Sequence, residues 1–309
     1  MSLAFVFPGQ GSQSEGMLSA LATEFSEVEA TFREASEVLG YDLWDIVQNG
    51  PADKLNSTDI TQPAMLAAGV AVWRVWQAKG GAQPTVLAGH SLGEYTALVC
   101  GGSLAFTDAI KLVAERGRLM QEAVPAGTGA MAAVLGLEDD VVRQVCSDAA
   151  AGEVLEAVNF NSPGQVVVAG NKAAVERLVD LAKERGAKRA LLLPVSVPSH
   201  CALMQPAADQ LASVLKEVAI QAPTIPVLNN ADVASPSDPD AIRDALVRQL
   251  YSPVRWVETI QKMNSDGVDR LIECGPGKVL VGLNKRIERK MAAQAMFDPD
   301  SLSAALAEE

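Results

Sequence analysis

The sequence of 309 residues predicts an α/β fold, in which a parallel sheet is covered by helices on both faces and a smaller subdomain is inserted. Two observations lead to this prediction. Short apolar runs alternate with helical stretches over the first and last parts of the chain, an order that is typical of parallel sheets. The middle part has a different order of elements and lies between glycine-rich and proline-rich joints.

Strand and helix alternate from the first residues to about residue 100. Leu3–Phe7 is an apolar run closed by Pro8 and Gly9, as expected of a buried strand that ends in a loop. Apolar residues then recur every three or four positions up to Gly40, a residue typical of helix ends, and Pro63 is a favourable first-turn residue for the next helix. Strands are therefore expected over 3–7 and 85–88, and helices over 18–39, 63–79 and 94–99.

The middle of the chain predicts a ferredoxin-like subdomain. Its segments follow the order βαββαβ, with Ser162-Pro163-Gly164 as the turn between the two central strands. We expect residues 127–196 to form this subdomain, and residues 1–126 and 197–309 to form the large domain. Within the subdomain, strands are expected over 130–135, 154–159, 165–169 and 189–193, and helices over 138–149 and 173–185.

The chain is expected to return to the large domain near Val197. Beyond this joint, helices are predicted over 202–218 and 241–251, and strands over 225–228 and 270–274. The last stretch, from about Asp298, is acidic and is expected to fray at its end.

The composition excludes several classes of function. The 25 Lys and Arg against 38 Asp and Glu give a net charge of −13, which opposes binding to a polyanion such as nucleic acid. No apolar run approaches the roughly 20 residues of a membrane-spanning helix, and the first residues lack the basic region of an export signal. The four cysteines are far apart and form no zinc-binding pattern. We therefore expect a cytoplasmic protein with no nucleic-acid, membrane or metal site.

The strongest chemical signal is Gly89-His90-Ser91-Leu92-Gly93, which matches the G-x-S-x-G nucleophile elbow and lies between a predicted strand and a predicted helix. Such a turn lifts the serine side chain out of the backbone, so Ser91 is the candidate nucleophile. The backbone N–H of Leu92, at the helix N-terminus, is placed to donate to a developing oxyanion. The alternative interpretation is an ordinary glycine-rich turn.

A serine hydroxyl needs a neighbouring base, and the chain has only two histidines. His90 precedes the serine in a turn that points it elsewhere, whereas His200 lies where the subdomain rejoins the large domain, and such joints commonly form clefts. His200 is therefore the candidate base, with a buried structural histidine as the alternative. The group that orients this base stays open, because Asp209, Asp232 or a carbonyl oxygen can fill that role.

Two glycine-containing stretches fall short of nucleotide-binding motifs. Gly9-Gln10-Gly11 is followed by Ser14 where the dinucleotide motif has a third glycine, and Gly277-Lys278 is followed by Val279 where a P-loop has serine or threonine. Residues 9–13 nevertheless follow the first strand, at the edge of the sheet where α/β proteins bind ligands. The backbone N–H groups of this stretch are candidates for the other half of an oxyanion hole, and a plain turn is the alternative.

Six motifs, taken together, resemble those of the malonyl-CoA:acyl carrier protein transacylases. The resemblance covers nearly the whole chain, and only the stretch after about Arg289 carries no motif of the family. The motifs, in the order of the family, are Phe7-Pro8-Gly9-Gln10-Gly11-Ser12-Gln13, Gly89-His90-Ser91-Leu92-Gly93-Glu94-Tyr95, Glu115-Arg116-Gly117 with Met120-Gln121, Asn159-Phe160-Asn161-Ser162-Pro163-Gly164-Gln165, Val195-Ser196-Val197-Pro198-Ser199-His200, and Gly275-Pro276-Gly277.

The resemblance implies an α/β-hydrolase-like large domain with the ferredoxin-like insert, and ping-pong transfer of malonyl from malonyl-CoA to the phosphopantetheine thiol of acyl carrier protein. Both thioesters are substrates, so no cofactor is implied. By similarity, Ser91 attacks the thioester with His200 as its base, and the backbone amides of Gln10 and Leu92 bind the oxyanion. The family also implies that a main-chain carbonyl near Gln249 orients His200.

The resemblance further implies how the substrate is bound. Arg116 stands where the family has an arginine that pairs with the malonate carboxylate, and a guanidinium group suits this pairing because it is bidentate and stays charged when buried. From the residues alone, Arg118 is an equally good candidate, and both arginines fit the surface of a helix. Asn161, Gln165 and Arg189 are expected along the path of CoA or pantetheine.

Three alternatives remain at the level of sequence. A serine esterase or thioesterase of the α/β-hydrolase type shares the elbow and the histidine but has no use for a buried arginine. An inactive acyltransferase-like binding module keeps the fold and loses Ser91, His200 or Arg116, all of which are present here. An acyltransferase selective for another acyl-CoA is the third alternative.

Overall fold

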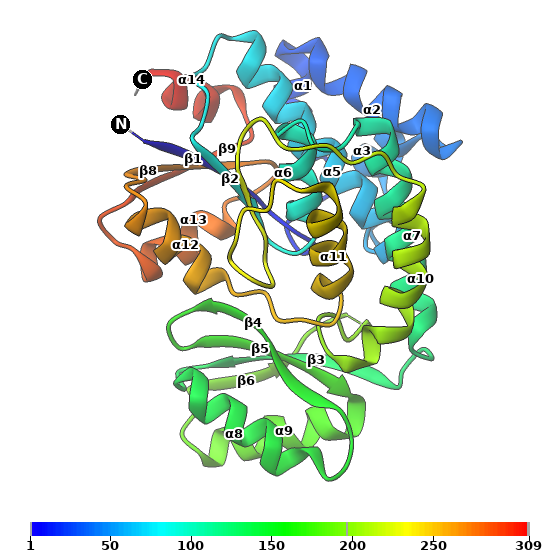
Figure 1. The fold of residues 1–309 in the computed structure, drawn as a ribbon, viewed down its shortest axis with the longest axis vertical. Coiled ribbons are helices and arrows are strands. Elements are labelled where there is room, and N and C mark those ends of the chain that lie inside the picture. Colours follow the sequence, from blue (N-terminus) through cyan, green and yellow to red (C-terminus); the bar gives the residue numbers. More distant parts are fainter. Residues whose placement is uncertain (1, 196, 308–309) are drawn as a thin grey trace.

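Five parallel strands form the larger sheet in the structure, a computed structural model that describes residues 2–195 and 197–307 (Figure 1). Their spatial order is β7-β2-β1-β8-β9, so β1 lies at the centre with β2 and β8 beside it. The α/β class with a parallel sheet is thereby confirmed. The strands are β1 (Leu3–Phe7), β2 (Val86–Gly89), β7 (Val227–Leu228), β8 (Arg270–Cys274) and β9 (Ala292–Met296).

Helices cover both faces of this sheet because alternate side chains of each strand point to opposite sides. On one face, Phe5 meets the rings of Trp73 and Trp76 edge-on, each with ring centroids 5.3 Å apart. On the other face, Ala4 and Val6 pack in a separate apolar cluster. The apolar core on the first face includes side chains of α1 (Ser19–Glu24), α2 (Ser26–Leu39), α3 (Leu43–Asn49), α5 (Thr58–Ala78), α6 (Gly93–Cys100), α7 (Phe106–Ala123) and α10 (Gln205–Lys216), and the cluster on the second face includes side chains of α12 (Trp256–Ser265) and α13 (Val279–Ile287).

The smaller sheet has four antiparallel strands in the order β4-β5-β3-β6, with α8 and α9 packed on its outer face (Figure 1). Its inner face carries Met131, Val167 and Ala169, which pack with Cys201 of the large domain. The order βαββαβ is the one predicted for a ferredoxin-like subdomain. Its elements are β3 (Gly129–Leu135), α8 (Asp139–Ala150), β4 (Leu155–Ser162), β5 (Gln165–Asn171), α9 (Lys172–Glu184) and β6 (Arg189–Leu192).

The domain boundaries, 1–126 and 197–309 against 127–196, stay a prediction. The second joint, and with it part of the motif before His200, falls on Ser196, which lies outside the described residues.

The helix expected over 18–39 is two helices. The chain is extended at Phe25, with φ −129° and ψ 107°, and α1 ends and α2 begins around this residue. The continuous three-and-four spacing hid the break because Phe25 packs against the same core as its neighbours. The predicted end at Gly40 is confirmed, since Gly40 has a φ of 77° and its N–H bonds to the carbonyl of Ser36.

The start predicted at Pro63 is wrong by about one and a half turns, because α5 begins at Thr58. Proline is favoured in a first turn, but here it lies inside the helix and removes one backbone hydrogen bond. Almost every residue of α5 around it is buried, and this packing outweighs the missing bond.

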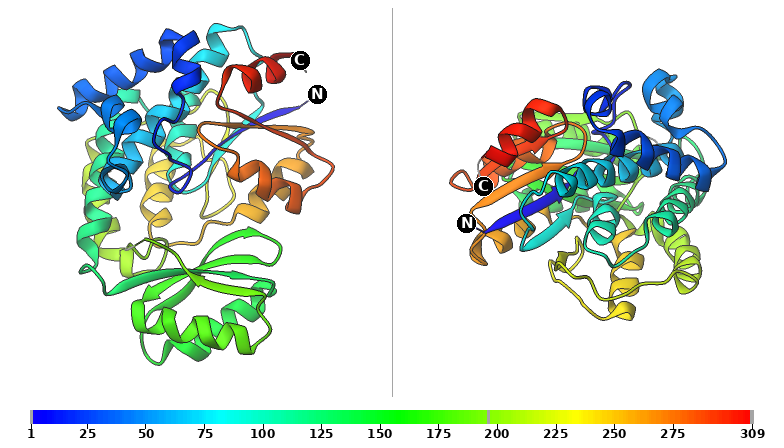
Figure 2. Two further views of the ribbon diagram at one scale, coloured as in Figure 1. Left: turned by 180° about the vertical axis from the view of Figure 1, so that it is seen from behind. Right: turned by 90° about the horizontal axis from the view of Figure 1, so that it is seen from above.

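The C-terminal stretch contains a helix that the sequence did not predict. Residues Pro299–Ala307 form α14, whose Leu302 and Ala305 are buried, and the chain end that was expected to fray, Glu308 and Glu309, lies outside the described residues. Figure 2 shows both termini at the same end of the larger sheet. The elements not yet named are α4 (Ala52–Leu55), the 3-10 turn η1 (Ala202–Met204) and α11 (Pro239–Gln249).

Among residues 2–195 and 197–307, no helix is both long enough and apolar enough to cross a membrane.

Candidate active site

The nucleophile elbow lies between β2 and α6, at the carboxyl end of the central strands. Ser91 has a φ of 51°, in the left-handed region that non-glycine residues rarely adopt. The two glycines around it are required by space: a Cβ on Gly89 would lie 1.8 Å from the carbonyl carbon of Gly93, and one on Gly93 would lie 2.0 Å from the oxygen of Phe7. The motif therefore has the structural context that a strained serine turn needs.

Ser91 and His200, 109 residues apart in sequence, are hydrogen-bonded to each other. The distance from Ser91 Oγ to His200 Nε2 is 2.8 Å. His200 Nδ1 lies 2.8 Å from the carbonyl oxygen of Gln249, and because a carbonyl only accepts, Nδ1 carries the proton and Nε2 is the acceptor for the serine hydroxyl. His200 also has a positive φ, 68°, so both members of the pair are held in rare backbone conformations.

The carbonyl of Gln249 thus orients His200, and neither aspartate considered from the sequence does so. Asp209 accepts a hydrogen bond from Gln205 on the exposed side of α10, and Asp232 forms an ion pair with Arg248.

Electrostatics keep His200 neutral. Its burial, together with the nearby charge of Arg116, lowers the pKa of His200 to about 3. A neutral imidazole is the form that can accept a proton, so the base is ready over the whole neutral range.

Arg116 is buried within the same site. Its Nη1 donates to Gln62 Oε1 at 2.8 Å and its Nη2 to Gln249 Oε1 at 3.0 Å, and its guanidinium lies 5.3 Å from the centre of the Tyr95 ring. These partners are neutral, and Nη2 is also 3.4 Å from Ser91 Oγ. A buried cation held by neutral amides beside a nucleophile is suited to a carboxylate on the bound acyl group.

The structure separates Arg116 from Arg118, which the sequence alone did not. Arg118 lies on the exposed side of α7 and pairs with Glu115 and Glu122. Of these two arginines, Arg116 is the one that reaches the nucleophile.

A cavity of about 250 Å³ opens beside Ser91, between the large domain and the inner face of the smaller sheet. Gln10, Leu92, Asn161 and Gln165 line it. None of the described residues accepts a hydrogen bond from the backbone N–H of Gln10 or of Leu92, so both donors are available to a ligand. The subdomain contributes apolar wall from Met131, Val167 and Leu193.

Of the three polar residues expected along the substrate path, Asn161 and Gln165 line the cavity and Arg189 does not. Asn161 Oδ1 lies 2.8 Å from His90 Nε2, so the ring of His90 pairs with Asn161, whereas His200 is the histidine bonded to Ser91 Oγ. Gln165 Oε1 accepts a hydrogen bond of 2.9 Å from Arg286 at the end of α13. Arg189 lies at the exposed start of β6 and is not among the described residues that line the cavity.

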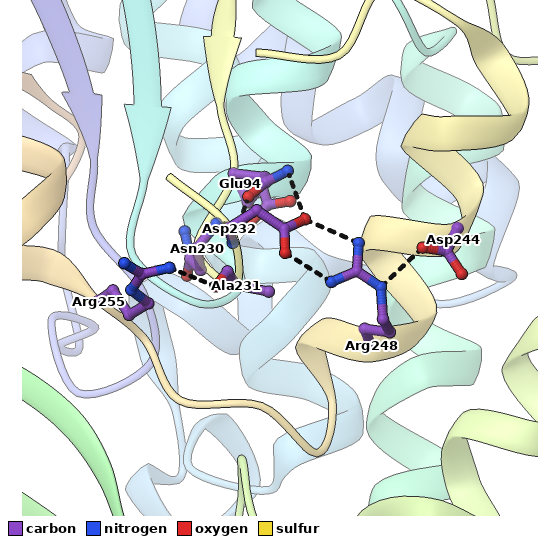
Figure 3. A network of polar contacts seen from close by, with 8 residues as sticks. Glu94, Asn230, Ala231, Asp232, Asp244, Arg248 and Arg255 are labelled. Atoms are coloured by element: carbon purple, nitrogen blue, oxygen red, sulfur yellow. Dashed lines mark hydrogen bonds and ion pairs between the residues drawn. The ribbon is translucent and has the colours of Figure 1, made fainter. Parts of the chain in front are cut away.

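Three further residues complete the site, and sequence reasoning assigned none of them a role. Gln62 holds Arg116, Asn230 accepts a hydrogen bond of 2.7 Å from the backbone N–H of Ser91, and Glu94 accepts from both Asn230 and Gln249. Figure 3 shows Glu94 beside Asn230, next to the ion pairs of Asp232 and Arg248. Glu94 stands within the elbow motif, but nothing in the sequence around Gln62 or Asn230 marks them.

Comparison with known proteins agrees with this geometry. The family model described as acyl transferase domain matches residues 4–295. The malonyl CoA-acyl carrier protein transacylase of Haemophilus influenzae is 62% identical over 302 residues, which cover 97% of each chain.

Two solved structures are similar over nearly their whole length. An acyl carrier protein S-malonyltransferase from Vibrio cholerae is 63% identical, with a TM-score of 0.96 over 98% of this chain and 99% of that chain. The malonyl-transacylase in a complex with a holo type II PKS acyl-carrier protein is 58% identical, with a TM-score of 0.99 over the whole of both chains. The chain therefore belongs to the acyl transferase family, among the malonyl-CoA:acyl carrier protein transacylases.

Proposed function

We propose that this protein transfers the malonyl group from malonyl-CoA to the phosphopantetheine thiol of acyl carrier protein, through a malonyl ester on Ser91, and so supplies malonyl-carrier protein for fatty acid synthesis. The observation that supports this function best is the buried guanidinium of Arg116, 3.4 Å from the oxygen of a serine that is hydrogen-bonded to a neutral histidine. A hydrolase of neutral esters has no use for such a cation. The proposed place of action is the cytoplasm.

In the first half-reaction, Ser91 Oγ attacks the thioester carbonyl and its proton passes to His200 Nε2. The C–S bond then breaks, and the CoA sulfur leaves with that proton. In the second half-reaction, the pantetheine thiol gives its proton to His200 and attacks the malonyl ester, and Ser91 Oγ recovers the proton as it leaves. The chain returns to its starting state with no net gain or loss of protons.

The backbone N–H groups of Gln10 and Leu92 are proposed to bind the oxyanion in both tetrahedral intermediates. They lie at the ends of β1 and β2, which are neighbours in the sheet, and both residues line the cavity. Donors that are in place before the reaction stabilise the developing charge without reorganisation, and removal of one such donor costs about 2.7–4 kcal/mol in other enzymes.

Substrate choice is proposed to depend on Arg116, which pairs with the free carboxylate of the malonyl group. Asn161 and Gln165 are proposed to contact pantetheine inside the cavity. Arg189, outside the cavity, is proposed to contact the CoA end of the donor.

The experiment that tests this function compares transfer with hydrolysis. The protein is incubated with malonyl-CoA and holo-acyl carrier protein, and both malonyl-carrier protein and free malonate are measured. We expect transfer to exceed hydrolysis by a large factor, and acetyl-CoA to be a poor donor. Rapid release of free acid with little transfer would identify an esterase or thioesterase, and faster transfer from another acyl-CoA would identify a different acyltransferase.

A further inference from the structure

A buried carboxylate lies directly behind the nucleophile, and the reaction proposed above gives it no step. Glu94 is only 2% exposed and lies in the first turn of α6, three residues after Ser91. One of its oxygens, Oε2, accepts two hydrogen bonds of 2.8 Å, one from the side chain of Gln249 and one from the backbone N–H of Asn230. Both of these partners touch the reacting groups.

Gln249 connects Glu94 with all three functional residues, through the main chain of Ser91 and the side chains of Arg116 and His200. Its Nε2, which donates to Glu94, also donates to the carbonyl oxygen of Ser91 at 3.0 Å. Its Oε1 accepts from Arg116 at 3.0 Å, and its main-chain oxygen accepts from His200 Nδ1 at 2.8 Å. The position of this one residue therefore sets the positions of nucleophile, base and substrate cation.

Asn230 holds the elbow itself. Its Oδ1 accepts from the N–H of Ser91 at 2.7 Å, and its Nδ2 donates to the carbonyl of Gly89 at 2.6 Å. The left-handed conformation of Ser91 costs about 1–3 kcal/mol and persists only when its surroundings hold it. The bond from the Asn230 backbone to Glu94 keeps this amide side chain in place.

We propose that Glu94 is a positioning residue for acyl transfer: its carboxylate fixes Gln249 and Asn230, and through them it holds Ser91, His200 and Arg116 in their working geometry. This inference rests on the proposed function, because it explains how that reaction is arranged and adds no step to it.

A second set of contacts, nearer the protein surface, joins the loop at residues 230–232 to the end of α11 and the segment after it (Figure 3). Arg248, the neighbour of Gln249, donates to both carboxylate oxygens of Asp232 at 2.7 Å, and Arg255 donates to the carbonyl of Ala231 at 3.2 Å. The Asp232–Arg248 pair is partly exposed, and exposed pairs typically contribute only about 0–1 kcal/mol. The buried hydrogen bonds of Glu94 to Asn230 and Gln249 are shielded from water. They therefore contribute more than the outer contacts to holding the loop at Asn230 against the end of α11.

The charge of Glu94 adds a pH dependence to this role. Burial raises the pKa of Glu94 to about 7, with Asp232 adding to the rise, whereas the hydrogen bonds from Gln249 and Asn230 and the charge of Arg116 oppose it. Below this pH the carboxylate becomes a neutral acid and its two charge-assisted hydrogen bonds weaken.

The other titratable groups near this cluster are His90, Tyr95 and His200, and none changes charge near pH 7. Burial lowers the pKa of His90 below its usual value, so its ring is neutral there. Burial raises the pKa of Tyr95 to about 12. The charge of Glu94 adds to this rise and the charge of Arg116 opposes it. His200, with a pKa of about 3, is already neutral. A rise of kcat/KM with pH through about 7 is thus expected to report Glu94.

The test uses the full-length protein and three variants, Glu94→Ala, Glu94→Gln and Glu115→Gln. Malonyl loading from malonyl-CoA is measured as kcat and KM between about pH 5.5 and 9, and the fold of each variant is checked by its melting temperature. Glutamine keeps an acceptor oxygen but cannot titrate. Glu115, on the exposed side of α7, is the control for loss of one carboxylate.

Glu94→Ala is expected to lower kcat by about 100-fold, because a misplacement of about 1 Å has that effect, while KM changes much less. Glu94→Gln should recover to within about tenfold of the native kcat at about pH 8 and lose the rise through pH 7. Glu115→Gln should match the native protein.

Three outcomes overturn the inference: Glu94→Ala folds and keeps its native kcat, its KM rises as much as its kcat falls, or Glu94→Gln keeps the native pH profile. If Glu94→Ala fails to fold, the profile of Glu94→Gln decides alone. Failure of the proposed function is a different result, namely a native protein that forms no malonyl ester at all.

Discussion

At the scale of single residues, the site combines a neutral base with a buried cation that forms no ion pair with the described residues. Arg116 is bonded to two amide oxygens, and the charge of Glu94 acts on it without a direct contact, so its full positive charge is not balanced in a low-dielectric site. In the proposed function, a substrate carboxylate supplies that balance and is drawn to within reach of Ser91. Selectivity for a malonyl group would then follow from the cost of leaving Arg116 unpaired.

Arg116→Ala is expected to lower kcat/KM for malonyl-CoA by about 10³-fold or more, while acetyl transfer falls little or rises, since sites built around a polar substrate group reject analogues that lack it. Steady-state kinetics with both donors measures this ratio, and Arg118→Ala is the matched control. Equal losses for the two donors would mean that Arg116 supports the fold and does not select.

His200→Gln should reduce malonyl loading by about 10³-fold, because nucleophile and base act as one unit. An ordinary histidine titrates near 6.5, and on that value the sequence predicts that activity falls on the acid side because of the base. In the structure the pKa of His200 is lowered to about 3, so protonation of this base does not explain a loss of activity between about pH 5 and 7.

The same lowered pKa has a consequence for stability. Between about pH 3 and 6.5 the unfolded chain binds a proton at His200 that the folded chain does not, so stability rises with pH in this window and is lost as the pH falls. The free energy of unfolding of the native protein should therefore fall more steeply on acidification than that of His200→Gln. The difference in slope corresponds to the uptake of up to about one proton on unfolding. Denaturant unfolding of both proteins at several pH values measures the difference, and parallel curves would contradict the lowered pKa.

Much of the site could be predicted from residue identity alone. Ser91 stands in a recognisable turn, and His200 was selected because the chain has only two histidines. The choice of Arg116 over Arg118 needed the family resemblance, since helix periodicity does not reveal which face of α7 meets the cavity. Asn230 and Gln62 could not be predicted, because each amide bonds a group far away in sequence and such a contact leaves no local pattern. Asn230 bonds the backbone of the elbow, and Gln62 bonds the side chain of Arg116.

At the scale of elements, the sheet positions the chemistry, because the carboxyl ends of β1 and β2 bring the loop at Gln10 and the elbow together. The predicted strands of both sheets were found because buried strands are short apolar runs with clear breaks. The strand β9 (AAQAM) was missed, because small residues and a glutamine give no such run. The break at Phe25 and the start of α5 were misplaced because tertiary packing overrode the local signals.

α14 offers a test of how far the C-terminal stretch belongs to the fold. Leu302 is buried in the main core, so Leu302→Ala should destabilise the protein by about 2–5 kcal/mol. Ser303, its exposed neighbour in the same helix, provides the control Ser303→Ala, which should change stability by less than about 0.5 kcal/mol. Chemical denaturation measures both, and similar small effects would show that α14 is peripheral.

At the scale of the whole molecule, the negative net charge of the chain opposes the docking of an acidic carrier protein. The chain carries −13 and acyl carrier proteins are strongly acidic as a class, so the two repel each other unless a local basic surface is present. One basic cluster, Lys285 and Arg286, lies on α13, and its Arg286 contacts the cavity-lining residue Gln165. A second basic cluster, in the subdomain, has two of its members, Lys183 and Arg185, already paired with Asp180 and Asp148; the others are Lys188 and Arg189. The α13 cluster is therefore the better placed of the two.

Reversal of both Lys285 and Arg286 to Glu should raise the KM for carrier protein several-fold and leave the KM for malonyl-CoA nearly unchanged. Added salt should weaken the carrier half-reaction more than the loading step, because charges at the rim act mainly on encounter. The double reversal of Lys188 and Arg189 is the comparison. If neither double variant changes the carrier KM or its response to salt, the basic clusters do not form the docking surface.

In the proposed reaction one serine carries the acyl group between two thiols, and an intact-mass measurement in two steps tests this role. Malonyl-CoA is added first and the modified peptide is mapped; holo-acyl carrier protein is added next and the loss of the adduct is followed. We expect one malonyl group on Ser91 that moves to the carrier thiol, and none on Ser91→Ala. An adduct on Cys201 or on any other residue, or transfer that persists without Ser91, would contradict it.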